Sequence, residues 1–362
     1  MPMIAQPPGL RLPRLTSRMR LDDFDYDLPG ERIAQTPIEP RDAARLLVDR
    51  GSEPPEHRHV RDLPDLLRAG DLLVVNETKV IPARLPLRRR TGGAAEVLML
   101  EPLDGERRRW EALVRPARKL RPGEQLLAPD GTPVVEVGHR TASGDTFGVT
   151  VLGPVAELDA LAVLDDHGEM PLPPYITERL DDPDRYQTVY AREPGSAAAP
   201  TAGLHFTSEL FDRLAAAGIE RVEVELVVGL DTFRPVHEDD PTRHRMHTER
   251  YRVPADTMER CLATRAAGGR VVAVGTTTVR ALESAALRGE LEGRTDIFIH
   301  RPYDWRVVDV LMTNFHLPRT TLLMMIDAFI GDRWRTLYDE ALSEQYRFLS
   351  FGDAMLLDRA AQ

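Results

Sequence analysis

The stretch GDLLVVNETKVIPARL, residues 70–85, decides the fold of this chain. After Asp71 it opens with the apolar run Leu72–Val75, which lacks the alternation of a half-exposed strand. Such a run is typical of a strand that is buried on both faces, as in a parallel sheet covered by helices. Directly after residue 85 the sequence changes to short alternating segments separated by turn residues, so the same stretch also marks the point where a second unit begins.

The second unit has the pattern of a small antiparallel barrel. Between residues 86 and 154, short alternating segments are separated by Gly, Pro and Asp turn signals; these segments are AAEVLMLEP, RWEALVRPA, EQLLAPDG, TPVVEVGHR and TFGVTVLG. Short strands at close, regular spacing favour a β-barrel. We therefore predict that a barrel is inserted into the larger unit.

Outside the barrel segment, strand and helix patterns alternate. RVEVELVVG (221–229) and RVVAVG (270–275) predict strands, and a helical pattern at 276–289 follows the second at once. Further helical patterns lie at 41–50, 156–168, 256–269 and 322–331. This alternation indicates the α/β class. The predicted organisation is a disordered, proline-rich basic tail at 1–20, a larger α/β domain formed by 21–85 plus 155–362, and the inserted β-barrel domain at 86–154.

Composition narrows the class of protein. The chain has 362 residues, a net charge of −11 and one cysteine, Cys261, so it holds no disulfide framework and fits a reducing cytoplasm. No apolar run is long enough to cross a membrane, and the N-terminus lacks the apolar segment of a signal peptide. The net charge argues against a protein whose whole surface binds nucleic acid. Local basic clusters, at 84–90, 106–110, 115–122 and 241–252, are either solvated faces or local contacts.

Two motifs place a histidine just before a helix. In PTAGLHFT (200–207), His205 precedes the capping run Thr207-Ser208-Glu209, and in TNFHLPRTTLLMM (313–325), His316 precedes an apolar helix. Either histidine is a buried core residue or a group that moves a proton. Free backbone N–H groups at a helix N-terminus favour an anionic ligand nearby.

A third motif, VAVGTTTVRALES (272–284), joins a buried strand to a helix that opens with Thr276, Thr277 and Thr278. Hydroxyls beside free N–H groups suit a carboxylate or phosphate. Arg280 and Glu283 are spaced to share one helix face, either as a ligand clamp or as a surface ion pair.

Other candidate groups are more ambiguous. HRMHTERY (244–251) offers His244, His247 and Glu249, but a third metal ligand at a useful spacing is lacking, so an acid, base or phosphate contact is favoured over zinc. The Pro- and Tyr-rich segments 168–176 and 184–191 read as ordered loops. Their aromatic and amide side chains would either contact a nucleobase or pack the loop; they are Tyr175, Tyr186, Gln187 and Tyr190.

The motifs occur in an order that resembles a known family. From residue 24 to 357 the chain reads FDYDLP, IAQTP, GDLLVVNETKVIPARL, TGGAAEVLML, PLPPYI, YQTVYA, PTAGLHFT, GLDTFRPV, MHTERY, VGTTTVRALES, DIFI, TNFHLP and YRFLSFGDAMLL. This order resembles the S-adenosylmethionine:tRNA ribosyltransferase-isomerase family of queuosine biosynthesis. The resemblance covers nearly the whole chain apart from about the first 20 residues, and it implies an α/β fold with an inserted β-barrel.

The resemblance also implies a reaction. The ribosyl group of S-adenosylmethionine, a co-substrate, is transferred to 7-aminomethyl-7-deazaguanine in the anticodon region of a tRNA and isomerised to epoxyqueuosine, with release of adenine and methionine. A base must take a proton from the carbon beside the sulfonium, and an acid must assist the departing adenine. No metal is implied. We further expect a cytoplasmic monomer with no membrane contact.

Site residues follow from the resemblance as hypotheses. We assign proton transfer to His205, His247 or His316, with Glu249 or Glu283 as partner. Thr276, Thr277, Thr278 and Arg280 are assigned to the methionine end. The remaining predicted substrate contacts are Thr201, Gly203, Phe206, Tyr186, Gln187, Asn314 and Arg84.

Several positions depart from the family pattern. In LVVGLDTF, Val227 stands for a histidine and Asp231 for a glycine. NETKV carries Glu77 and Lys79 where the family has Asn-Asp-Thr-Arg-Val. RPY carries Arg301 and Pro302 where Pro-Gly-Tyr is usual, and Val310 replaces a glycine. The departures leave an alternative open, in which a paralogue uses S-adenosylmethionine with a free nucleobase or another small acceptor.

Overall fold

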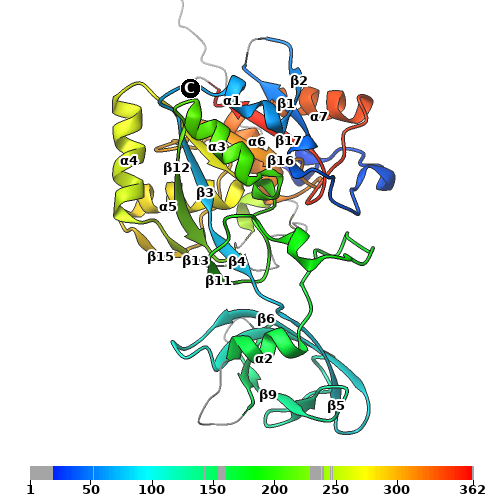
Figure 1. Ribbon diagram of the computed structural model, residues 1–362. Helices are drawn as coiled ribbons and strands as arrows, with labels where there is room; N and C mark the ends of the chain where they lie inside the picture. Colours follow the sequence, from blue (N-terminus) through cyan, green and yellow to red (C-terminus); the bar gives the residue numbers. More distant parts are fainter. Residues whose placement is uncertain are drawn as a thin grey trace, which may run out of the picture.

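The computed structural model describes residues 19–360 apart from 52, 142–143, 154–159, 229–237, 239, 245 and 247. Figure 1 shows two parts: a large sheet flanked by helices, and a barrel that lies beyond one end of this sheet. This is the predicted combination of an α/β unit with a closed antiparallel β-barrel. The predicted tail at 1–20 lies almost wholly outside the described residues.

The large sheet has nine strands in the order β15-β13-β12-β3-β14-β16-β17-β1-β2. Its centre is parallel, because β3 pairs in parallel with both β12 and β14, and β14 pairs in parallel with β16. The strands are β1 Arg45–Asp49, β2 Glu56–His59, β3 Leu72–Asn76, β12 Glu220–Leu226, β13 Glu249–Arg252, β14 Val271–Val274, β15 Glu292–Thr295, β16 Val310–Asn314 and β17 Ala354–Asp358.

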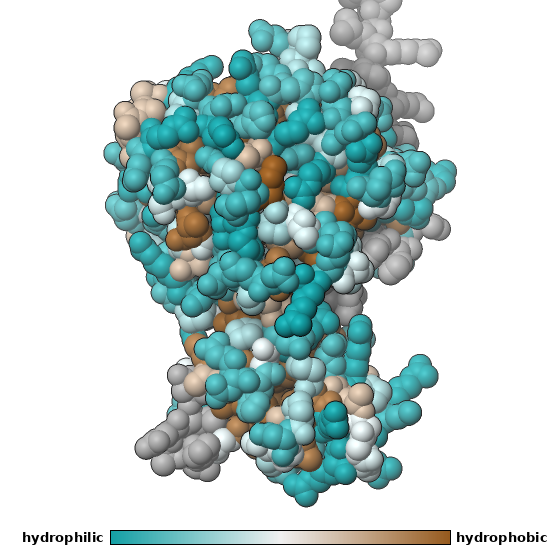
Figure 2. Space-filling view, turned by 45° about the vertical axis from the view of Figure 1, so that its right-hand side comes forward, coloured by the Kyte–Doolittle hydropathy of each residue, from teal (hydrophilic) through white to brown (hydrophobic). Residues whose placement is uncertain are grey.

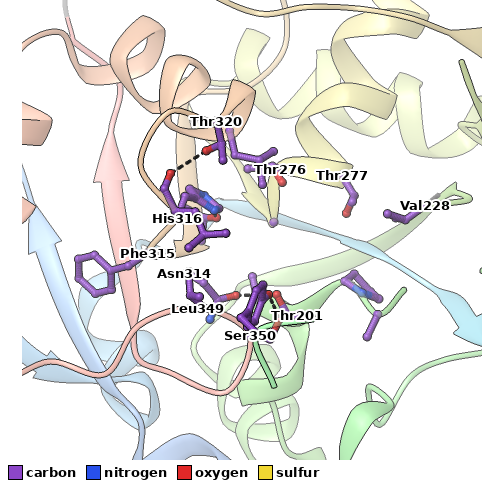
Figure 3. A pocket seen from close by; sticks show the side chains of 18 residues that line it. Thr201, Val228, Thr276, Thr277, Asn314, Phe315, His316, Thr320, Leu349 and Ser350 are labelled. Atoms are coloured by element: carbon purple, nitrogen blue, oxygen red, sulfur yellow. Dashed lines mark hydrogen bonds between the residues drawn. The ribbon is translucent and has the colours of Figure 1, made fainter. Parts of the chain in front are cut away.

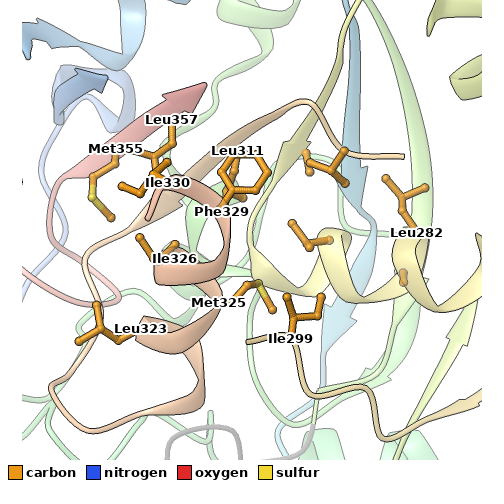
Figure 4. Close-up of a cluster of buried hydrophobic side chains, with 14 of the residues drawn as sticks. Leu282, Ile299, Leu311, Leu323, Met325, Ile326, Phe329, Ile330, Met355 and Leu357 are labelled. Carbon is orange, nitrogen blue, oxygen red and sulfur yellow. The ribbon is translucent and has the colours of Figure 1, made fainter. Parts of the chain in front are cut away.

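Strand β3 has the two-sided burial that its sequence predicts. Leu72 and Val74 belong to one hydrophobic cluster, whereas Leu73 and Val75 belong to another on the opposite face. The first cluster includes residues of the helices α4 (Ala255–Ala266), α5 (Thr276–Arg288), α6 (Thr321–Ile330) and α7 (Arg333–Ser343). The second includes residues of α1 (Leu63–Leu66) and α3 (Ser208–Ala216). Figure 4 shows part of the first cluster, where Phe329 of α6 lies beside Leu311 of β16, and Ile326 and Leu323 lie further along the same helix. Helices therefore cover both faces of the central strand.

Helices α2 to α6 follow predicted helical patterns, whereas α1 and α7 were not predicted. The helices are α1 Leu63–Leu66, α2 Ala160–His167, α3 Ser208–Ala216, α4 Ala255–Ala266, α5 Thr276–Arg288, α6 Thr321–Ile330 and α7 Arg333–Ser343. The predicted cap before α3 is confirmed, because the side chain of Thr207 accepts from Leu210 N. The side chain of Thr320 caps α6 in the same way, by accepting from Leu323 N.

The helix predicted at 41–50 is wrong. The segment forms a short 3-10 turn, Arg41–Ala43, and then strand β1. Leu46, Leu47 and Val48 are completely buried between β17, which pairs in parallel, and β2, which pairs antiparallel. Pairing on both edges outweighs the helical spacing of the apolar residues.

The barrel closes in the order β10-β7-β6-β5-β8-β9. Its strands are β5 Arg84–Arg89, β6 Ala94–Pro102, β7 Arg109–Arg115, β8 Gln125–Leu127, β9 Pro133–Arg140 and β10 Phe147–Val151. Each alternating segment identified between 86 and 154 contains one of these strands. Helix α2, which the sequence analysis assigned to the α/β domain, packs Ala160 and Leu164 into the hydrophobic cluster of the barrel.

The chain passes between the two parts at two places. On the way in, it follows β4 (Thr78–Val80), which pairs in parallel with β11 (Glu193–Ser196). On the way out, Gly168 lies against the first connection: a Cβ atom there would be 1.9 Å from the carbonyl oxygen of Pro82. Only glycine allows the two connections to lie this close. Figure 2 shows that the molecule is narrow between the two parts, and we call this narrow region the waist.

Candidate active site

A cavity lies at the carboxyl ends of the parallel strands β14 and β16. Ligands of open α/β sheets bind at this edge, where the loops leave the strands. Residues from distant parts of the chain line it: Tyr175, 199–202, Val228, 275–277, 313–317, Thr320, Leu322 and 349–350. Figure 3 shows Thr201, Thr276, Thr277 and His316 arranged around this space.

The N-terminus of α5 forms one wall. Gly275 caps the helix with φ 86°, a conformation that glycine adopts without strain, and donates its N–H to Met312 O at 2.7 Å. The first N–H groups of the helix have no partner within the helix. Thr277 Oγ1 is buried and has no hydrogen-bond partner among the described residues, although the residue lines the cavity. Free donors and the positive end of the helix dipole together suit an anionic group.

The other residues predicted on α5 turn away from the cavity. Thr278 is completely buried and donates to Val274 O at 2.7 Å, so it joins the helix to its own strand. Glu283 accepts from three backbone N–H groups, those of residues 306, 307 and 308, each at 3.0 Å. That carboxylate holds a loop, and it does not line the cavity.

Arg280 and Glu249 form a buried ion pair, and the two residues are 2% and 6% exposed. Burial lowers the pKa of Arg280 to about 10. Its Nε and Nη2 atoms have no hydrogen-bond partner among the described residues. The structure therefore joins two predicted site residues to each other, outside the cavity lining. His247 and Asp231 lie outside the described residues.

His316 faces the cavity and is 8% exposed. Its Nε2 lies 3.1 Å from Thr313 Oγ1, and its backbone N–H donates to Tyr338 Oη at 3.0 Å. Burial lowers the pKa of the ring from 6.5 to about 3, so the imidazole is neutral near pH 7. A neutral ring is ready to accept a proton, and its low pKa reduces the driving force for the transfer.

His205 lies behind the wall of the cavity. It ends the 3-10 turn Thr201–His205, and its Nε2 is 3.2 Å from Asn314 Nδ2. Asn314 Nδ2 also donates to Asp353 O, and its Oδ1 accepts from Thr201 Oγ1 at 2.9 Å, which sets the orientation of the amide. Burial, with Arg347 as a lesser cause, lowers the pKa of His205 to about 4. The neutral ring thus accepts from Asn314, and Asn314 and Thr201 face the cavity.

The remaining predicted contacts have structural neighbours. A Cβ atom on Gly203 would lie 2.0 Å from Tyr190 Oη, so the missing side chain makes room for that tyrosine. Phe206 is completely buried and stacks on Phe211. These two residues do not line the cavity.

Three further predicted residues lie near the waist. Tyr186 is completely buried and packs edge-on against Phe351. The amide of Gln187 bonds both backbone groups of Val80, with Nε2 donating at 2.6 Å and Oε1 accepting at 3.0 Å. Arg84 starts the barrel and lies 3.4 Å from Glu96. Gln187 and Arg84 line a separate groove between barrel and sheet.

Sequence reasoning missed part of the lining. Ser350 accepts or donates the hydrogen bond that holds Tyr175 Oη at 2.7 Å, and both residues line the cavity. Leu349 beside it has φ 70°, an unusual value for leucine. The segment YRFLSFGD, in which a glycine and an aspartate follow aromatic residues, is the sequence feature that could have indicated a lining loop here. Nothing in the local sequence shows that this loop lies close to residues 275–277.

Among the described residues, no group of three His, Cys, Asp or Glu side chains could hold a metal ion. Within the same part of the chain, no helix is long and apolar enough to span a membrane.

Comparisons with known proteins agree on one family. A family model described as a queuosine biosynthesis protein matches residues 21–357. The S-adenosylmethionine:tRNA ribosyltransferase-isomerase of Symbiobacterium thermophilum is 55% identical over 347 residues, which cover 94% of this chain and 100% of the relative. The protein of that name from Synechococcus elongatus is 51% identical over 348 residues, covering 94% and 96%.

A solved structure extends the likeness to three dimensions. The crystal structure of the S-adenosylmethionine tRNA ribosyltransferase from Thermotoga maritima matches with a TM-score of 0.53 at 38% identity, over 92% of this chain and 99% of that one. The enzyme described here belongs to the S-adenosylmethionine:tRNA ribosyltransferase-isomerase family of queuosine biosynthesis.

Proposed function

We propose that this enzyme transfers and isomerises the ribosyl group of S-adenosylmethionine onto 7-aminomethyl-7-deazaguanine in the anticodon region of a tRNA. The product is epoxyqueuosine, and adenine and methionine leave. The observation that carries the proposal is the cavity at the ends of β14 and β16, where the free N-terminus of α5 faces the neutral ring of His316.

The methionine carboxylate is assigned to the N-terminus of α5. The N–H groups of Thr276 and Thr277 and the unpartnered hydroxyl of Thr277 would bind it. Arg280, which sequence reasoning placed at this end, is held by Glu249 and is not needed for this contact.

Proton transfer is assigned to His316. The carbon next to the sulfonium loses a proton to the imidazole, which is unprotonated near neutral pH. Adenine takes up a proton as its glycosidic bond breaks, and the acceptor amine loses one as it forms the new C–N bond. Because His205 is already an acceptor for Asn314, we assign it to positioning Asn314 and Thr201.

The described departures from the family pattern lie outside the cavity, which favours the family reaction over a new acceptor. Arg301 makes two hydrogen bonds to Asp327, at 2.6 and 2.7 Å, and so ties its loop to α6. Val227 lines a groove near β13, and Val310 is completely buried in β16. These residues do not line the cavity.

The deciding experiment measures adenine release from S-adenosylmethionine with three acceptors: tRNA that carries 7-aminomethyl-7-deazaguanine, the free base, and none. Release only with the modified tRNA is expected. Release with the free base would contradict the proposal and establish the small-acceptor alternative. Tight S-adenosylmethionine binding without release in any of the three would equally contradict it.

A further inference from the structure

The end of the barrel away from the large sheet carries three connections. The register places them together, because Arg88 pairs with Ala94, Glu96 with Arg115, and Phe147 with Arg140. The chain enters the barrel at the opposite end, where β5 begins at Arg84. We call the described residues of these connections, 88–94, 115–124, 139–141 and 144–146, the distal basic surface.

The charge of this surface is opposite to that of the whole chain. Its segments hold two acidic residues, Glu124 and Asp145, in a chain whose net charge is −11. They hold eight basic ones: Arg88, Arg89, Arg90, Arg115, Arg118, Lys119, Arg121 and Arg140. A local excess of this kind attracts a polyanion even on an acidic protein.

Most of these cations are free to meet a ligand. Arg118, Lys119 and Arg121 are exposed, and none of the three has an ion-pair partner among the described residues. The side chain of Arg115 is 83% exposed, and its ion pair with Glu96 is long, at 3.9 Å. Glu96 also pairs with Arg84. Many arginines of the large domain are instead paired with carboxylates, such as Arg288 with Asp296 and Arg270 with Asp71.

The surface is also held in place. Arg140 donates to Gly144 O at 2.6 Å and to Ala117 O at 3.4 Å, so it ties two of the three connections together. Its guanidinium also lies 4.6 Å from the ring centre of Phe147. Arg89 and Glu124, joined at 2.6 Å, link the remaining connection to the same loop. Loops that are already held in this way lose less entropy when the cations they carry bind an anion.

We propose that the distal basic surface binds the phosphate backbone of the RNA substrate while the target base occupies the cavity in the α/β part. The inference rests on the proposed function. The two sites are on different parts of the molecule, separated by the waist in Figures 1 and 2. A nucleobase or a small amine is too short to contact both, whereas a folded RNA is long enough. Clustered arginines without acidic partners are suited to phosphates.

The test compares two double variants of the full chain. Arg118→Ala with Arg121→Ala removes two charges from the surface, and Arg68→Ala with Arg213→Ala removes two exposed charges from the large domain as the matched control. The probe is an unmodified tRNA transcript, and its Kd is measured by fluorescence anisotropy at several KCl concentrations. Adenine release is measured in parallel with tRNA that carries the aminomethyl base.

We expect the surface variant to bind the transcript roughly tenfold more weakly at moderate salt, and the slope of log K against log salt to fall by about 1.4 to 1.8. The control should match the wild type in both. The kcat for adenine release at saturating tRNA should stay at the wild-type value, because neither arginine lies near the cavity.

Wild-type affinity and salt slope in the surface variant would overturn the inference and leave the proposed function standing, provided the wild type binds and modifies tRNA. Absence of tRNA binding by the wild type would overturn both. Binding of the wild type to phosphatidylserine vesicles, lost in the surface variant while tRNA binding is kept, would assign the surface to a membrane instead and overturn the inference.

Discussion

Asn314 donates a hydrogen bond to His205, with its Nδ2 3.2 Å from the Nε2 of the ring. The same amide nitrogen reaches Asp353 O at 3.3 Å, so the oxygen of Asn314 must point to Thr201 Oγ1. His205, which does not line the cavity, thus fixes the side chains of Asn314 and Thr201, which do line it. The relationship assigns His205 a positioning role that its motif alone did not indicate.

This role predicts a graded response at residue 205. His205→Ala should lower kcat about tenfold, because one hydrogen bond that orients Asn314 is lost, and should leave the Kd of S-adenosylmethionine within about twofold. His205→Gln should recover most of the activity, since a glutamine oxygen can accept from Asn314. Steady-state kinetics and calorimetric binding check both variants. A loss of about a thousandfold or more in both would make His205 a direct proton carrier instead.

Neighbouring threonines on α5 allow a matched comparison. Thr277→Val removes a buried hydroxyl that has no hydrogen-bond partner in the part of the chain that the structure describes, so the protein should keep its stability. The affinity for S-adenosylmethionine should fall about tenfold, because a hydrogen bond to a charged carboxylate is lost. Thr278→Val is the control: it breaks the 2.7 Å bond to Val274 O and should cost about 1 kcal/mol of stability without changing affinity.

Calorimetry and urea denaturation separate the two effects. Unchanged S-adenosylmethionine affinity in the Thr277 variant would remove the carboxylate from the N-terminus of α5. Equal loss of affinity in both variants would show that the helix position matters and the hydroxyl does not.

His316→Gln should lower kcat about 10² to 10⁴-fold while S-adenosylmethionine still binds, because the base is lost and the shape is nearly kept. Since the pKa of His316 is about 3, this residue should produce no acidic limb in the rate profile between pH 5 and 8. His57→Gln, on the edge strand β2, is the control and should be fully active. A wild-type ionisation near pH 6.5 that disappears in His316→Gln would contradict the assignment.

The sequence predicted the fold well where local pattern and burial agree. The run Leu72–Val75 is apolar on both faces of β3 because helices cover both faces, and the barrel strands alternate because only one side is buried. Residues 41–50 show the limit. Their spacing fits a helix, but 45–49 form a strand because they pair with β2 on one edge and with β17, some 300 positions along the chain, on the other.

The site was harder to predict, because motifs show which residue types are present and not which way they face. The motif around residue 205 and the motif around residue 316 look alike, yet only His316 lines the cavity. Gly203 lies against Tyr190 and not against a ligand. Both facts depend on contacts between segments far apart in sequence, which no local pattern encodes.

The two buried histidines also make stability depend on pH. Their folded-state pKa values, about 4 for His205 and about 3 for His316, lie below the ordinary 6.5, so the unfolded chain binds protons first as the pH falls. Stability from each ring is fully present above pH 6.5. It is lost on acidification at up to about 1.4 kcal/mol per pH unit, until the folded pKa is reached.

Urea denaturation of the wild type and His316→Gln between pH 6.5 and 5 tests this. The free energy of unfolding of the wild type should fall more steeply, by about one proton, that is about 1.4 kcal/mol per pH unit in the lower half of the range. His139→Gln removes an exposed histidine of the barrel and should keep the wild-type slope. Parallel slopes for the wild type and His316→Gln would mean that His316 becomes protonated in the folded protein near pH 6. The base proposed for the reaction would then already carry a proton in acidic solution.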